Sequence, residues 1–136
     1  MRRRVLGAAL ASLALFTAGC GGGEEAAAGA GDASCEPTES TVLTGSVGTE
    51  EDPEAFEIAL TDESGEPVTC LAAGDYTIEV SDPAQEHNFH LTGGSVDETT
   101  SVPETEETTW EVTLEPGEYT YKCDPHPPMT GSFTVV

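Results

Sequence analysis

Short segments in which apolar and polar residues alternate dominate the chain from about residue 42 to its end. The pattern is clearest at residues 76–80 (Tyr-Thr-Ile-Glu-Val) and 110–114 (Trp-Glu-Val-Thr-Leu), where every second side chain is apolar. A period of two predicts β-strands with one buried face, and Trp110 is then expected in the core. Further strands are predicted at residues 42–47, 56–60, 87–91, 119–123 and 131–136. No stretch keeps a helical period over three turns.

Turn signals separate these segments. Residues 62–67 (Asp-Glu-Ser-Gly-Glu-Pro) form one turn cluster, and residues 115–118 (Glu-Pro-Gly-Glu) place Pro and Gly where a type II turn prefers them. Seven or eight short strands at this spacing predict an all-β fold, a Greek-key β-sandwich, without internal repeats.

The N-terminal part of the chain has a different character. Three arginines precede an apolar run too short to span a bilayer, so residues 1–19 are predicted to be an export signal, by the general or the twin-arginine route. Residues 17–20 (Thr-Ala-Gly-Cys) resemble a bacterial lipobox, which predicts a lipid on Cys20; the alternative is ordinary cleavage with Cys20 incidental. Residues 20–34 lack aromatic and β-branched side chains and are expected to be a flexible tether to a domain at residues 35–136.

Removal of the signal would leave an almost purely acidic chain. All three arginines lie within it, so Lys122 remains as the only Lys or Arg against 26 acidic residues, a formal charge of −25 compared with −22 for the whole chain. Such a charge excludes binding to nucleic acid, whose phosphates it repels. It also repels anionic lipids, which favours a covalent lipid anchor, and it makes the folded state dependent on screening by salt.

Three potential metal ligands lie in one short loop, Cys123, His126 and Met129. A structural zinc site recruits more Cys or His, and calcium or magnesium requires oxygen ligands. Thiolate, imidazole and a weak thioether suit copper, and a second imidazole completes the ligand set of a blue-copper site. Three prolines inside the loop restrict its unbound conformations. The Cys-x2-His pair alone would also fit half of a zinc site.

Residues 121–129 (Tyr-Lys-Cys-Asp-Pro-His-Pro-Pro-Met), together with residues 87–90 (His-Asn-Phe-His), resemble the ligand segments of small blue-copper cupredoxins. The ligand spacing is similar to that of amicyanins, and the acidic, tethered form is similar to halocyanins. The resemblance implies a cupredoxin fold that holds one type 1 copper ion. The ligands it implies are His87, Cys123, His126 and Met129.

The resemblance also assigns roles around the ligands. Asn88 matches the family Asn that ties the two ligand segments together, but its usual Ser or Thr partner is replaced by Asp124. An acid so close to the thiolate is expected to stabilise Cu(II) over Cu(I) and to lower the reduction potential. On a strand, His87 and His90 point to opposite faces, so only one can join the site unless the strand bulges. The resemblance selects His87 and leaves His90 as a surface or packing residue.

The remaining cysteines suggest a disulfide. Disulfides persist outside the cytoplasm, and Cys35 and Cys70 are left once Cys20 and Cys123 have been assigned. Closing this loop would stabilise the fold by roughly 3–4 kcal/mol in the chain-entropy model. The alternative, Cys123 in a disulfide, would exclude the copper site.

These features predict a monomeric one-electron carrier, anchored by lipid at the outer face of the cytoplasmic membrane, that serves redox partner proteins. His126 is expected to pass the electron through an apolar surface formed by Pro127, Pro128 and Met129. A second metal or an acid–base pair is not required, and three histidines are too few for a multicopper enzyme, so no catalytic activity is expected. Two alternatives remain: an extracytoplasmic copper carrier or store, and a cupredoxin-shaped module that uses no metal.

Overall fold

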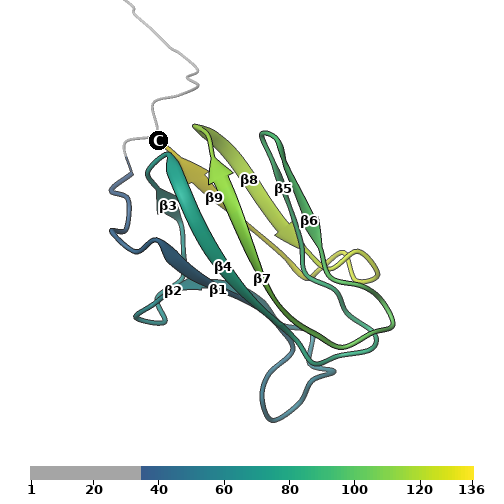
Figure 1. Ribbon diagram of the computed structural model, residues 1–136. Coiled ribbons are helices and arrows are strands. Elements are labelled where there is room, and N and C mark those ends of the chain that lie inside the picture. Colours follow the sequence, from purple (N-terminus) through teal and green to yellow (C-terminus); the bar gives the residue numbers. More distant parts are fainter. Residues whose placement is uncertain (1–34) are drawn as a thin grey trace, which may run out of the picture.

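The computed structural model describes residues 35–136, which form two β-sheets packed face to face (Figure 1). This part of the chain contains nine strands and no helix. The strands are β1 (Val42–Val47), β2 (Ile58–Asp62), β3 (Cys70–Leu71), β4 (Gly74–Asp82), β5 (His90–Gly93), β6 (Val96–Thr99), β7 (Glu106–Leu114), β8 (Gly117–Lys122) and β9 (Thr130–Val135). The predicted all-β sandwich is confirmed, with more strands than the seven or eight expected.

Three predictions fall outside these residues. The signal at residues 1–19, the tether at residues 20–34 and the lipid on Cys20 all lie in the part that the structure does not describe. Within residues 35–136, no helix has the length and apolar character needed to cross a membrane.

The two sheets are mixed, and neighbours in sequence often lie in different sheets. One sheet has the order β2-β1-β4-β7, and the other has the order β3-β9-β8-β5-β6. Strands β1 and β4 run parallel, as do β3 and β9, and the remaining pairs are antiparallel. The pairing of His90 with Lys122 sets the residues before β5 beside those after β8.

The core lies between the sheets, where the alternating apolar side chains meet. Two aromatic stacks run through it, Phe89 on Tyr121 and Tyr119 on Phe133, with ring centroids 5.6 and 5.2 Å apart. Trp110, expected in the core, is only partly buried and packs against it. The largest fully buried side chains include Tyr119, Phe89, Leu43, Leu60, Leu71, Ile78, Leu91 and Leu114.

Several predicted strand boundaries were wrong. The strand expected at residues 87–91 begins only at His90, so His87 lies in the connection before it. The strand expected at residues 56–60 begins at Ile58 and leaves Phe56 in a loop. Strand β6 was not predicted because most of its side chains are exposed, which removes the alternation that marks a half-buried strand.

The predicted disulfide between Cys35 and Cys70 is present, with Cα atoms 5.8 Å apart. It ties the first described residue to β3, which pairs with the C-terminal strand β9. Cys123 is free and buried, so the alternative in which it forms a disulfide is not seen in the described part of the chain.

Candidate metal centre

Three side chains from two distant segments converge at one end of the sandwich. The Nδ1 atoms of His87 and His126 are 2.9 Å apart. The Cys123 Sγ lies 3.6 Å from the His87 Nδ1 and 3.5 Å from the His126 Nδ1. His87 and Cys123 are buried, and His126 is partly exposed. Among the described residues, these three form the only group of potential metal ligands with such close mutual distances.

The geometry of this group fits a metal ion. A point equidistant from the three atoms lies about 2 Å from each, which is close to metal–imidazole and metal–thiolate bond lengths. The ligand types, two imidazoles and one thiolate, are those of a trigonal copper site. The second ring nitrogen of His87, Nε2, is buried without a hydrogen-bond partner, so Nδ1 is the atom of that ring with polar neighbours.

Backbone hydrogen bonds shape the ligand loop. The Cys123 N–H donates to the Met129 carbonyl at 2.9 Å, and the Met129 N–H donates to the His126 carbonyl at 2.8 Å. A further bond from the His126 N–H to the Cys123 carbonyl, at 3.3 Å, closes the first turn. The loop is therefore fixed by its own backbone before any ion binds, and its prolines restrict it further.

Met129 is 2 % exposed and belongs to the same core cluster as Cys123. Its burial excludes it from the apolar surface that the sequence predicted around His126. Pro127 and Pro128 are exposed there, as expected.

Phe56 supplies an aromatic ring that the sequence did not predict at this site. Its centroid lies 4.6 Å from that of His126 and 5.6 Å from that of His87, edge-on to both, while 65 % of the residue stays exposed. Gly48 helps to place it, because its N–H bonds to the Glu57 carbonyl at 2.8 Å and closes the loop. At Gly48, φ is +66°, and an added side chain would collide with the Pro53 backbone. The one sequence feature that could have indicated this role is that Phe56 is a lone aromatic residue in an acidic, turn-rich segment.

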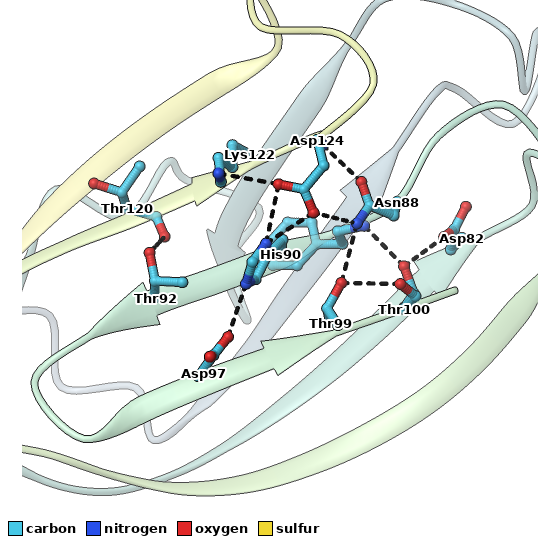
Figure 2. A network of polar contacts seen from close by, with 11 residues as sticks. Asp82, Asn88, His90, Thr92, Asp97, Thr99, Thr100, Thr120, Lys122 and Asp124 are labelled. Atoms are coloured by element: carbon cyan, nitrogen blue, oxygen red, sulfur yellow. Dashed lines mark hydrogen bonds and ion pairs between the residues drawn. The ribbon is translucent and has the colours of Figure 1, made fainter. Parts of the chain in front are cut away.

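Asn88 connects the segment that contains His87 to the segment that contains Cys123. Its side-chain oxygen accepts the Asp124 N–H at 2.7 Å, and its Nδ2 donates to the Asp124 Oδ2 at 2.9 Å. The same Nδ2 lies 3.0 Å from the Thr99 Oγ1 (Figure 2). The first of these bonds uses the backbone at residue 124, so the tie does not require the usual Ser or Thr.

Asp124 is the centre of a charged network outside the metal pocket (Figure 2). Its carboxylate lies 2.8 Å from the His90 Nδ1 and 3.0 Å from the Lys122 Nζ. Partial burial opposes ionisation, but hydrogen bonds from Asn88, His90 and Lys122 outweigh it and lower the pKa of Asp124 to about 2. His90, expected as a surface or packing residue, is half-buried and bonded to the residue that follows Cys123.

A second polar chain supports the segment between His87 and β5. The Phe89 N–H donates to the Thr100 Oγ1 at 2.8 Å, and that hydroxyl donates to the Asp82 Oδ2 at 2.6 Å. Asp82 is fully buried. Burial raises the pKa of Asp82, and the hydrogen bonds from Thr100 and Ala84 offset this only in part. These bonds anchor the irregular backbone beside His87.

No protein-family model matches the sequence, and no curated relative is found at significant similarity. Solved structures do match. Reduced rusticyanin is 16 % identical with a TM-score of 0.50, and the match covers 74 % of this chain and 82 % of rusticyanin. Auracyanin from the photosynthetic bacterium Roseiflexus castenholzii is 18 % identical with a TM-score of 0.45, and the match covers 71 % of this chain and 98 % of auracyanin. An amicyanin variant is 18 % identical with a TM-score of 0.44, and the match covers 68 % of this chain and 80 % of amicyanin.

The described domain therefore has a cupredoxin-like fold, and the resemblance to the small blue-copper cupredoxins is confirmed at the level of fold. The His-Cys-His group lies in the arrangement that a type 1 site needs.

Proposed function

We propose that this protein is a type 1 blue-copper protein that carries single electrons outside the cytoplasmic membrane. The observation that carries the proposal is the convergence of the His87 Nδ1, the His126 Nδ1 and the Cys123 Sγ within 3.6 Å of one another. Met129, buried in the same cluster, would be the weak axial ligand. When bound, copper supplies a one-electron couple between Cu(II) and Cu(I).

The protein contributes a rigid and largely dry pocket. Cys123 is 1 % exposed and His87 is fully buried, so water reaches the three ligand atoms only from the side of His126. The closed ligand loop and the Asn88 tie keep the two segments in place when the charge of the ion changes. A site that changes little in geometry is suited to fast electron transfer. No residue in this arrangement is required as acid, base or nucleophile, and we propose no enzymatic activity.

The electron would enter and leave beside His126. This ring is partly exposed and is flanked by Phe56, Pro127 and Pro128. Exposed acids follow one another in the loop that carries Phe56, namely Glu50, Glu51, Asp52, Glu54 and Glu57. An apolar contact bordered by negative charge favours a redox partner protein with a basic surface.

The expected export signal, the lipid on Cys20 and the tether at residues 20–34 complete the proposal. They would hold a monomeric domain, residues 35–136, at the outer face of the cytoplasmic membrane, within reach of membrane-bound partners. Radiolabelled fatty acid incorporated by the wild type and not by Cys20→Ser would support the anchor. Equal labelling of both chains would contradict it.

A redox titration tests the function itself. The copper-loaded protein should take up one electron per chain and return it over repeated cycles, while a chelator removes little metal. A copper carrier or store would instead release its ion to the chelator at a rate that competes with the redox cycle. Rapid and complete release would therefore favour the alternative function.

A further inference from the structure

His90 is bonded to a carboxylate through each of its ring nitrogens. Its Nδ1 lies 2.8 Å from the Asp124 Oδ2, and its Nε2 lies 2.8 Å from the Asp97 Oδ1 (Figure 2). A neutral imidazole has one N–H and one lone pair, so one of these contacts would set a lone pair against an anion. Both contacts are favourable only when both nitrogens carry protons. The geometry therefore points to an imidazolium cation at His90.

Two strands and one loop bring charged groups to His90. Asp97 lies on β6, Lys122 lies on β8, and Asp124 lies in the loop after β8; the neutral Asn88, before β5, bonds Asp124. Within residues 35–136, Lys122 is the only Lys or Arg. His90 is thus one of only two cations available to Asp124.

Burial of the ring opposes its charge, but the hydrogen bonds to Asp97 and Asp124 outweigh it and raise the pKa of His90 above 6.5. A raised pKa agrees with the two carboxylate contacts of the ring, which both favour the protonated form.

We propose that His90 is a positioning residue of the metal centre, which holds Asp124 against Asn88 and offsets its negative charge beside the Cys123 thiolate. The proposal rests on the function proposed above. It revises the expectation drawn from the sequence, in which an uncompensated Asp124 would stabilise Cu(II). With His90 charged, the acid adjacent to the thiolate is paired on its outer side. A bound copper ion would take up the single electron itself, going from Cu(II) to Cu(I), and His90 would keep its proton throughout.

The test compares reduction potentials at about pH 6, below the ordinary pKa of histidine. In His90→Gln the cation is lost, and we expect the equilibrium between Cu(II) and Cu(I) to move toward Cu(II) by a factor of about 3 to 10. This corresponds to a reduction potential lower by roughly 30 to 59 mV for a one-electron couple. His90→Arg keeps a cation that can bond both carboxylates and should recover most of the shift. Thr92→Val is the matched control, since Thr92 lies on the same face of β5 and bonds only the Thr120 carbonyl.

The double variant separates the positioning of Asp124 from a general disturbance of the fold. In an Asp124→Asn background His90 has no carboxylate to hold at residue 124, so the part of the His90→Gln shift that comes from a displaced Asp124 is lost, and the shift should be smaller than in the wild type. A shift of equal size in both backgrounds would overturn the proposal. So would equal potentials for the wild type and His90→Gln.

A measurement without copper keeps the proposal testable if a variant fails to fold. Nitrogen NMR of the metal-free wild type should show His90 with two ring protons at about pH 6, below the ordinary pKa of histidine, and a neutral ring there would overturn the proposal. If His90 is doubly protonated but the wild type shows no one-electron couple, the proposed function fails, and with it the electrostatic role of His90. The positioning of Asp124 is then tested on its own. In His90→Gln the hydrogen bond from the Asp124 N–H to the Asn88 side-chain oxygen should be lost, and an unchanged bond would overturn the positioning role.

Discussion

Cys123 and Asp124 are adjacent in sequence and have opposite surroundings. The Cys123 side chain is buried in the core cluster, whereas 42 % of the Asp124 side chain is exposed and lies among polar partners. The end of β8 therefore directs a soft ligand inward and a carboxylate outward. As a consequence, the network around Asp124 can influence the site electrostatically without contacting an ion in it.

Phe56 is the residue whose removal should expose the site most directly. Its ring packs against both imidazoles, and 65 % of the residue is exposed, so the fold depends little on it. For Phe56→Ala we expect copper release to a chelator to become several-fold faster. The change in the free energy of unfolding should stay within about 1 kcal/mol. Stopped-flow chelation and urea unfolding provide the two readouts.

Val102→Ala is the control for this variant, because Val102 is also an exposed apolar residue, at 44 %, and lies outside the site. Its release rate should match that of the wild type. Equal rates for Phe56→Ala and the wild type would show that the ring does not shield the ligands.

The pH dependence of stability should report the charge on His90. Its pKa in the folded state is raised, so its contribution is fully present below about pH 6.5, the ordinary value, and is lost as the pH rises through the folded pKa. The difference in unfolding free energy between the metal-free wild type and His90→Gln should therefore shrink as the pH rises from 6 to 9. A difference that is constant or grows over this range would contradict the assignment.

At the scale of the elements, the alternating pattern was a good guide where one face of a strand is buried. Residues 76–80 and 110–114 fall inside β4 and β7, and these strands pair along their whole length. The pattern failed where burial does not alternate. Strand β6 is largely exposed, and β3 has two residues that are both buried. Tertiary pairing, which is not encoded in local periodicity, defines both.

In the candidate site, too, some residues could be predicted from the sequence and others depend on tertiary structure. The sequence placed Cys123, His126 and Met129 in one loop, and the resemblance selected His87. The Phe56 contact could not be predicted, because it depends on how the loop after β1 folds back across the end of the sandwich. The pairing of His90 with Asp124 was also missed. The prediction placed residue 87 at the start of a strand, which would turn His90 to the opposite face from His87. Nothing in that arrangement suggested that His90 would bond Asp124.

The disulfide should stabilise the fold without building the site. It closes a sequence separation of 35 residues and ties the start of the domain to β3. Replacing both Cys35 and Cys70 by serine should lower the free energy of unfolding by about 2–4 kcal/mol. The reduction potential of the remaining folded protein should be unchanged, since neither residue contacts the ligands. A stability loss below about 1 kcal/mol or a changed potential would contradict this separation.

For the whole molecule, charge is the dominant feature. The sequence has 26 acidic residues, and Lys122 is the only Lys or Arg after the expected signal. Most of the acids in the described domain are exposed and unpaired with any cation, so they repel one another across a small surface. Salt shortens the range of this repulsion from about 30 Å at 0.01 M to about 3 Å at 1 M.

The melting temperature should therefore rise with sodium chloride at neutral pH. We expect an increase of several degrees between about 0.01 and 1 M, measured by circular dichroism of the metal-free protein. At about pH 3.5, below the ordinary pKa values of Asp and Glu, the same addition should raise the melting temperature less. An equal or larger rise at the acidic pH would show that repulsion between carboxylates is not the cause.

The visible absorption spectrum after addition of Cu(II) is the decisive test of the blue-copper site. The sample is the domain of residues 35–136, which contains both sheets, the disulfide and the core. A blue-copper site should give an intense blue thiolate-to-copper charge-transfer band that disappears on reduction and is absent in Cys123→Ser. A colourless or weakly coloured product that still binds copper would show that Cys123 is not a ligand, and the blue-copper assignment would be wrong.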